Sequence, residues 1–84
     1  MQITLYTKPN CHLCEQLQDD LAWVQREVDF TVTSVDITGD PALMSQFQYL
    51  IPVLEIAGVL YYPPHDLLQL RQRLLDAVRA NAAS

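Results

Sequence analysis

The stretch Thr7-Lys8-Pro9-Asn10-Cys11-His12-Leu13-Cys14 separates a strand-like segment from a helix-like one. Before it, residues 2–6 (QITLY) combine apolar and β-favouring side chains, which predicts a strand that ends at the Lys-Pro-Asn loop. After it, apolar residues recur at spacings of three and four, which predicts an amphipathic helix with Asn10 as its N-cap. These apolar residues are Leu13, Leu17, Leu21, Val24 and Val28. The two cysteines therefore lie where a strand passes into a helix.

The next part of the chain predicts a second strand and a second helix. Residues 30–37 (FTVTSVDI) are rich in β-branched side chains, which are typical of strands, and Gly39 ends the run. Asp40 and Pro41 are a typical N-cap and first helical residue, and they predict a short helix over residues 41–48. Because strands joined through a helix form right-handed crossovers, we expect the first two strands to be parallel neighbours.

The last part of the chain predicts a hairpin and a final helix. Residues 52–56 and 59–62 are expected to form two antiparallel strands joined by a tight turn at Ala57-Gly58. Pro63-Pro64 ends the second of them, and leucines at helical spacing predict a helix that begins near His65-Asp66. Residues 80–84 are expected to form a frayed tail.

The element order βαβαββα predicts an α/β fold with a central mixed four-stranded sheet and helices on both faces. The chain has 84 residues, which is short, so we expect a single domain over residues 1–84 and a monomer. Ten acidic residues oppose five basic ones, giving a net charge of −5, which disfavours nucleic acid and anionic membrane surfaces as partners.

Cysteine usage bears on the compartment and on the role of the pair. The chain begins with a strand-like segment rather than a secretory signal or membrane span, so we expect a cytoplasmic protein. Cytoplasmic thiols are normally reduced, and two cysteines are too few for the framework of a disulfide-stapled scaffold. Pairing of Cys11 with Cys14 would therefore be functional.

The position of Cys11 favours redox chemistry. A helix N-terminus carries unpaired N–H groups and about half a positive charge, which stabilise an anion such as a thiolate. Cysteines at such positions can have a pKa lowered from about 8.5 to roughly 3.5–7.5. We assign Cys11 as the nucleophile and Cys14, three residues later on the same helix face, as the thiol that resolves a mixed disulfide. A protonated His12 would tune the neighbouring thiolate.

The two cysteines have two other interpretations. A structural zinc site needs four ligands, and only His12 and His65 could complete it, so we expect no metal site. Alternatively, both cysteines could be inert, because free cysteine is among the most buried residue types. That interpretation is credible for Cys14, which lies one turn inside the apolar face, and less so for the pair.

Nearly the whole chain resembles the glutaredoxin branch of the thioredoxin-fold superfamily. Three landmarks carry the resemblance: the stretch from Thr7 to Cys14, Ile51-Pro52-Val53 before the hairpin, and Gly58 in its turn. The resemblance implies a glutaredoxin-type fold and a cis bond at Ile51-Pro52, where the backbone before the proline pairs with the substrate. It also implies that Lys8 binds a glutathione carboxylate.

Two segments depart from the family pattern. His-Leu replaces the common Pro-Tyr between the cysteines, and Tyr61-Tyr62-Pro63-Pro64-His65-Asp66 replaces a Gly-Gly pair followed by an acidic residue. Proline has no N–H and fixes φ, so this half of the glutathione site is altered. Asp66 could still match the acidic residue. The sequence leaves glutathione open as a co-substrate.

The function hypothesis is a dithiol oxidoreductase that reduces or exchanges disulfides of proteins or small molecules, with no bound cofactor. The site residues that this hypothesis predicts are Cys11 and Cys14 for catalysis and Lys8, His12, Ile51 and Pro52 for substrate binding. Two alternatives stay open: a non-catalytic binding module with the thioredoxin fold, and an iron–sulfur carrier in which two chains share a cluster.

Overall fold

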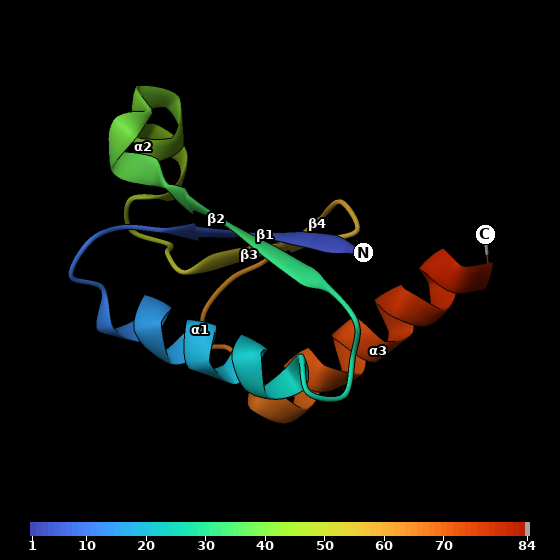
Figure 1. Cartoon of the computed structure of the whole chain (residues 1–84). Helices are drawn as coiled ribbons and strands as arrows, with labels where there is room; N and C mark the ends of the chain where they lie inside the picture. Colours follow the sequence, from blue (N-terminus) through green and yellow to red (C-terminus); the bar gives the residue numbers. More distant parts are fainter. Residues whose placement is uncertain (84) are drawn as a thin grey trace.

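A mixed four-stranded sheet forms the centre of the computed structural model, which describes residues 1–83 (Figure 1). Its strands are β1 (Gln2–Thr7), β2 (Thr31–Asp36), β3 (Val53–Ile56) and β4 (Val59–Tyr61). The helices are α1 (His12–Val24), α2 (Pro41–Phe47) and α3 (Leu67–Ala83), and a short 3₁₀ helix, η1 (Ile37–Gly39), follows β2. The predicted order βαβαββα is confirmed.

The sheet has the spatial order β2-β1-β3-β4, so β1 is one of its two central strands. β1 pairs with β2 in parallel, with Leu5 opposite Ser34, and with β3 antiparallel, with Leu5 opposite Leu54. β3 and β4 form the predicted antiparallel hairpin. The cysteine motif therefore follows the carboxyl end of a central strand of the sheet.

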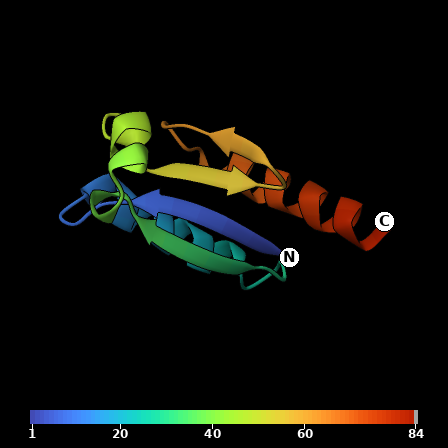
Figure 2. The same cartoon turned by 90° about the horizontal axis from the view of Figure 1, so that it is seen from above.

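Helices cover both faces of the sheet, as the sequence predicts (Figures 1 and 2). α1 and α3 lie on one face, and α2 lies on the other, near the end of the sheet where β1 and β2 finish. The larger core lies between the sheet and the α1–α3 layer and contains Ile3, Leu5, Leu17, Leu21, Val24, Val28, Phe30, Leu54, Ile56, Leu70 and Leu74. A smaller core on the α2 side contains Ile37, Phe47 and Val53.

α2 has the N-terminus that the sequence predicts. The Oδ1 of Asp40 accepts hydrogen bonds from the N–H groups of Ala42 and Leu43, at 2.9 and 3.3 Å, and Pro41 opens the helix. β2, by contrast, ends at Asp36, one residue before the predicted end. The Thr38 N–H and hydroxyl both donate to Asp36, which turns the chain into the 3₁₀ helix at that point.

The prediction of a frayed tail is wrong for residues 80–83. α3 runs without interruption to Ala83, because three of its last four residues are alanine, the residue with the highest helix propensity. The predicted tail also included Ser84, which lies outside the described residues. Within residues 1–83, no helix is both long and apolar enough to cross a membrane.

The hairpin turn consists of two residues with positive φ, Ala57 at 51° and Gly58 at 81°. Such a pair is typical of the type I′ turn, whose twist matches that of the flanking strands. Gly58 has open space around the position of an added Cβ, so backbone conformation alone decides the effect of a substitution there.

Replacing Gly58 with alanine should lower the free energy of unfolding by about 1–2 kcal/mol, because a side chain disfavours the left-handed conformation. Urea denaturation measures this loss. Gly39→Ala is the matched control, since Gly39 also has open space around it and does not have positive φ. Equal stability changes in the two variants would contradict the assignment of the turn.

Candidate active site

The cysteine pair forms a disulfide at the N-terminus of α1, with a distance of 5.2 Å between the two Cα atoms. Cys11 is the N-cap of the helix, with extended backbone, and its Sγ accepts a hydrogen bond of 3.2 Å from the Cys14 N–H. Cys11 is partly exposed, whereas Cys14 is only 2% exposed. Cys11 is therefore the more exposed residue of the disulfide, and Cys14 is buried.

The sequence prediction that Asn10 caps α1 is wrong. Asn10 has φ of 58°, a left-handed conformation that asparagine tolerates better than most residues. This turn reverses the chain between β1 and α1, so that the next residue, Cys11, reaches the cap position instead. A sulfur atom thereby takes the place at the helix end that oxygen atoms of Ser, Thr, Asp or Asn usually occupy.

The buried stripe of α1 begins at Cys14 rather than at Leu13. Leu13 is 60% exposed, so its predicted place on the core-facing side is wrong, whereas the other predicted apolar residues of the stripe are buried. The residues that do face the core are Cys14, Leu17, Leu21 and Val24, spaced at three and four. An apolar side chain between the two cysteines is thus left at the surface.

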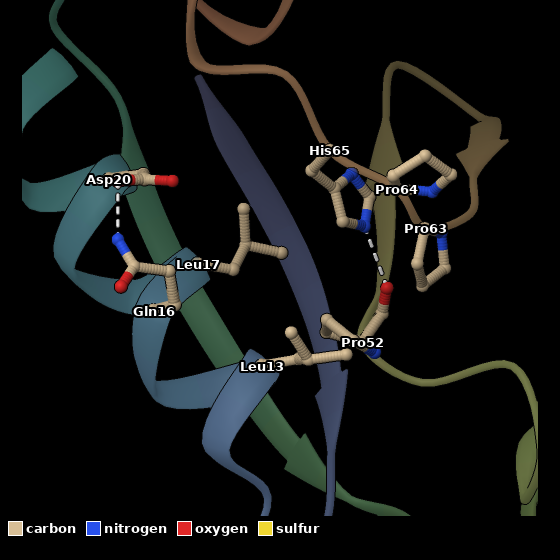
Figure 3. Close-up of a pocket in the computed structure, with 8 residues that line it drawn as sticks. All are labelled: Leu13, Gln16, Leu17, Asp20, Pro52, Pro63, Pro64 and His65. Carbon is tan, nitrogen blue, oxygen red and sulfur yellow. Dashed lines mark hydrogen bonds between the residues drawn. The ribbon is translucent and has the colours of Figure 1, made fainter.

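Pro52 lies beside the start of α1, just before β3. The peptide bonds Ile51-Pro52 and Pro63-Pro64 are both cis, as the resemblance implied for the first. Pro52 is buried and Ile51 is half-buried. Pro52 lines a cavity together with Leu13, which brings the proline loop and the cysteine loop to the same end of the sheet (Figure 3).

His65 fixes the Pro52 loop, and the sequence analysis gave it no such role. Its Nε2 lies 2.8 Å from the Pro52 carbonyl oxygen, and because that oxygen only accepts, the ring nitrogen donates (Figure 3). The bond joins the segment before α3 to the segment before β3.

The register of the hairpin explains why the Pro52 carbonyl takes its hydrogen bond from His65. Leu54 pairs with Tyr61, so continuing the register by two residues places Pro52 opposite Pro63. In an antiparallel hairpin, hydrogen-bonded and non-hydrogen-bonded residue pairs alternate, and the pair next to a two-residue turn is hydrogen-bonded. By this alternation, the Pro52 carbonyl would accept a hydrogen bond from the N–H of residue 63. Proline has no N–H to donate. The ring of His65 supplies the missing donor to a buried carbonyl.

Two cavities flank α1 at this end of the molecule. The first is apolar, has a volume of about 360 Å³, and is lined by Leu13, Gln16, Leu17, Asp20, Pro52, Pro63, Pro64 and His65 (Figure 3). The second is polar, has a volume of about 300 Å³, and is lined by Thr7, Lys8, Pro9, Asn10, Cys11, Cys14, Glu15, Gln18 and Asp36. Both cysteines border the polar cavity, and Leu13 borders the apolar one.

Charges of both signs lie around the disulfide. Lys8 lines the polar cavity together with the carboxylates of Glu15 and Asp36. Hydrogen bonds from the Thr38 hydroxyl and N–H hold the pKa of Asp36 below its ordinary value, which keeps it ionised. The two carboxylates oppose the one lysine of this cavity lining, so the N-terminus of α1 is the other source of positive charge beside Cys11.

The structure brings together some of the predicted site residues and not others. Lys8, Cys11 and Cys14 line one cavity, and Pro52 lines the other. His12 is exposed and, within the described chain, borders neither of these two cavities. In residues 1–83, no group of three or more His, Cys, Asp or Glu side chains is placed to hold a metal ion.

Comparison with known proteins shows which family the chain belongs to. The sequence pattern of the family described as "Glutaredoxin-like domain (DUF836)" matches residues 2–78. The chain belongs to this family. The resemblance found in the sequence is thereby confirmed.

Similar proteins and solved structures extend the comparison for this glutaredoxin-like domain. XcR50 from X. campestris is 39% identical, with a TM-score of 0.72, over 89% of this chain and 96% of that one. Thioredoxin 1 from Thermosipho africanus shares the fold at 12% identity, with a TM-score of 0.71, over 98% of this chain and 99% of that one. An uncharacterized Mycobacterium tuberculosis protein is 29% identical over 62 residues, which cover 68% of this chain. The chain spans 64% of the length of that curated relative.

Replacing His65 with phenylalanine keeps a ring and removes the donor to Pro52. We expect the free energy of unfolding to fall by about 1–3 kcal/mol, the usual effect of leaving a buried carbonyl without a partner. Urea denaturation measures it. The same substitution at exposed His12 is the control and should change stability by less than about 0.5 kcal/mol. A His65→Phe variant as stable as the control would show that the hydrogen bond contributes nothing.

Proposed function

We propose that this glutaredoxin-like domain is a thiol-disulfide oxidoreductase that reduces or exchanges disulfides through Cys11 and Cys14. The observation that carries the proposal is the difference in exposure and hydrogen bonding between the two cysteines at the N-terminus of α1. Cys11 is partly exposed and accepts the Cys14 N–H, whereas Cys14 is almost fully buried. A nucleophile has to meet its substrate, and a resolving thiol has to meet only the nucleophile.

The N-terminus of α1 stabilises negative charge on the attacking Cys11 sulfur. In the reduced protein, the N–H that now donates to the Cys11 sulfur would donate to its thiolate, and hydrogen bonds to ionised groups are about twice as strong as neutral ones. The helix dipole acts in the same direction. Both effects stabilise the charged, reactive form.

The reaction cycle needs only thiols and disulfides. The Cys11 thiolate attacks one sulfur of the substrate disulfide, the substrate S–S bond breaks, and the leaving sulfur takes up a proton as a thiol. Cys14, deprotonated, then attacks Cys11 in the mixed disulfide and releases the second substrate thiol. The substrate gains two electrons and two protons, and the protein is left with the Cys11–Cys14 bond. Two external thiol groups restore the dithiol in the reverse sequence and leave as a disulfide.

Substrate contacts are proposed on both sides of Cys11. Lys8, which shares the polar cavity with Cys11, would attract an anionic group of the substrate. The backbone at Ile51 and Pro52 would lie along the substrate chain, as it does in glutaredoxins. Glutathione is a candidate reductant, although Pro63 and Pro64 stand where that family offers glycine N–H groups. We propose a cytoplasmic setting, where thiol reductants are abundant.

Two serine variants test the assignment of roles. The reduced protein is mixed with 2-hydroxyethyl disulfide and analysed by intact mass. Cys14→Ser should accumulate one mixed disulfide on Cys11, because nothing resolves it. Cys11→Ser should react at least about 100-fold more slowly, because its remaining thiol is buried and is not at the helix cap.

The pH profile of alkylation separates the two thiols. Alkylation of Cys11 in the Cys14→Ser variant should have its midpoint below about 8.5, the value of a free cysteine. Equal reactivity of the two variants, or a midpoint at or above 8.5, would contradict the proposed roles.

A further inference from the structure

The central sheet has one long open edge. β2 is the last strand on one side of the sheet and pairs with β1 on its inner side (Figure 2). It has six residues, four of them exposed, and within residues 1–83 no strand pairs with its outer side. An open edge presents a row of backbone N–H and C=O groups that can pair with another extended segment.

The outward-facing backbone groups of β2 belong to Val32 and Ser34. The Thr31 N–H donates to the Met1 carbonyl oxygen, at 2.9 Å, so the backbone groups of Thr31 face β1. Along a strand in a parallel pair, the N–H and C=O of one residue point to the same side, and successive residues alternate. The backbone groups of Thr33 therefore also face β1, whereas those of Val32 and Ser34 point away from the sheet.

The β2 edge lacks the features that usually keep an open edge from pairing. Its sequence, TVTSVD, contains no proline, lysine or arginine, and its register with β1 runs without a bulge. The other edge strand, β4, has only three residues and is followed by Tyr62 and by Pro63-Pro64. Short strands and prolines protect an edge. β2 is therefore the edge that is available for pairing.

We propose that β2 pairs antiparallel with β2 of a second copy of this chain, so that the two four-stranded sheets join into one. Pairing of β2 with β4 would add further copies without end, and β4 is protected. Pairing of β2 with itself instead uses up the open edge of both copies and closes at a two-fold dimer. The inference goes beyond the proposed redox function and does not depend on it. It replaces the monomer expected from the length of the chain.

Symmetry limits the registers of such a dimer. Residues directly opposite each other in a sheet point to the same face, so a two-fold antiparallel pair places one residue opposite its own copy. With Thr33 opposite Thr33, the free backbone groups of Val32 meet those of Ser34 in the second copy. Each of the two Val32–Ser34 pairs then exchanges two backbone hydrogen bonds.

The two neighbouring registers pair fewer free groups. With Val32 opposite its own copy, Ser34 would meet Phe30, whose carbonyl oxygen already accepts a hydrogen bond of 3.1 Å from the Gln25 side chain. With Ser34 opposite its own copy, Val32 would meet Asp36, where the chain leaves the strand for the 3₁₀ helix η1. The register centred on the residue between Val32 and Ser34 is therefore favoured.

The side chains of β2 suit this register. Val32 packs against the larger core, so Thr33 points to the opposite face of the sheet, where it is exposed. Two threonines directly opposite each other form a favourable cross-strand pair. Asp36, the one charged residue of β2, would lie about 20 Å from its own copy along the strands, so like charges do not meet.

Sedimentation velocity at protein concentrations from about 10 µM to 1 mM tests the dimer. The wild type should change from monomer to dimer in this range, because pairing through one strand buries a small area and gives weak association. Thr33→Lys should weaken dimerisation about fivefold, because the two lysines would lie directly opposite each other.

Thr31→Lys is the matched control for Thr33→Lys. Both threonines are exposed on the same face of β2, and each makes one exposed side-chain hydrogen bond, Thr33 with Gln2 and Thr31 with Met1. In the proposed register a lysine at position 31 would face Val35 rather than its own copy. The dissociation constant should therefore change by less than about twofold.

Cysteine cross-linking tests the register. Thr33→Cys and Thr31→Cys are each made in a chain whose own thiols are removed by Cys11→Ser and Cys14→Ser, and are oxidised with glutathione disulfide. The two copies of residue 33 would have Cα atoms about 4.5 Å apart, within disulfide range, whereas those of residue 31 would lie about 13 Å apart along the strands. Thr33→Cys should therefore form the intermolecular disulfide at least about tenfold faster.

Each test has a result that contradicts the proposal. A wild-type protein that stays monomeric up to about 1 mM would overturn the dimer. Equal weakening by the two lysine substitutions, or equal rates of cross-linking at positions 31 and 33, would overturn the pairing of β2 through Thr33. None of these results bears on the reaction of Cys11 with 2-hydroxyethyl disulfide, so the failure of this inference is distinguishable from failure of the proposed function.

Discussion

The hydrogen bond from the Cys14 N–H to the Cys11 sulfur links the fold of this protein to its chemistry. It exists because β1 ends in the middle of the sheet, the chain turns back through Asn10, and α1 starts one residue later. The same geometry buries Cys14 against the core and leaves Cys11 at the surface. A change in the length of the loop between β1 and α1 would move Cys11 off the helix cap. The Cys14 N–H would then no longer donate to the more exposed sulfur.

The surroundings of the pair are built by the other sheet elements. β3 brings the Pro52 loop to the start of α1, and the hydrogen bond with His65 attaches the segment before α3 to that loop. Where the family pattern has flexible glycines with free N–H groups, this chain has two prolines and a histidine side chain as donor. The wall that this segment contributes to the apolar cavity therefore offers proline rings in place of glycine N–H groups.

The spacing of apolar residues predicted the helices and strands of the fold well, because an element buried on one face carries apolar residues at its own period. Leu17, Leu21 and Val24 follow the helical repeat, and the turn at Gly58 has a composition typical of hairpins. The ends of elements were predicted less well. The cap at Cys11 was missed because asparagine is the more common N-cap, and the left-handed conformation of Asn10 depends on how β1 and α1 meet in space. The contact between His65 and Pro52 spans thirteen residues, and counting the hairpin register to Pro63 was the signal that could have revealed it.

Whether Cys11 and Cys14 form a reversible redox couple is measured by their equilibrium with glutathione buffers of graded ratio. Alkylation of free thiols followed by intact mass measurement gives the oxidised fraction at each ratio. We expect a reversible two-electron transition between about −120 and −270 mV, the range of thiol-disulfide exchange proteins. A pair that stays reduced at every ratio, or a bond that never opens, would contradict it.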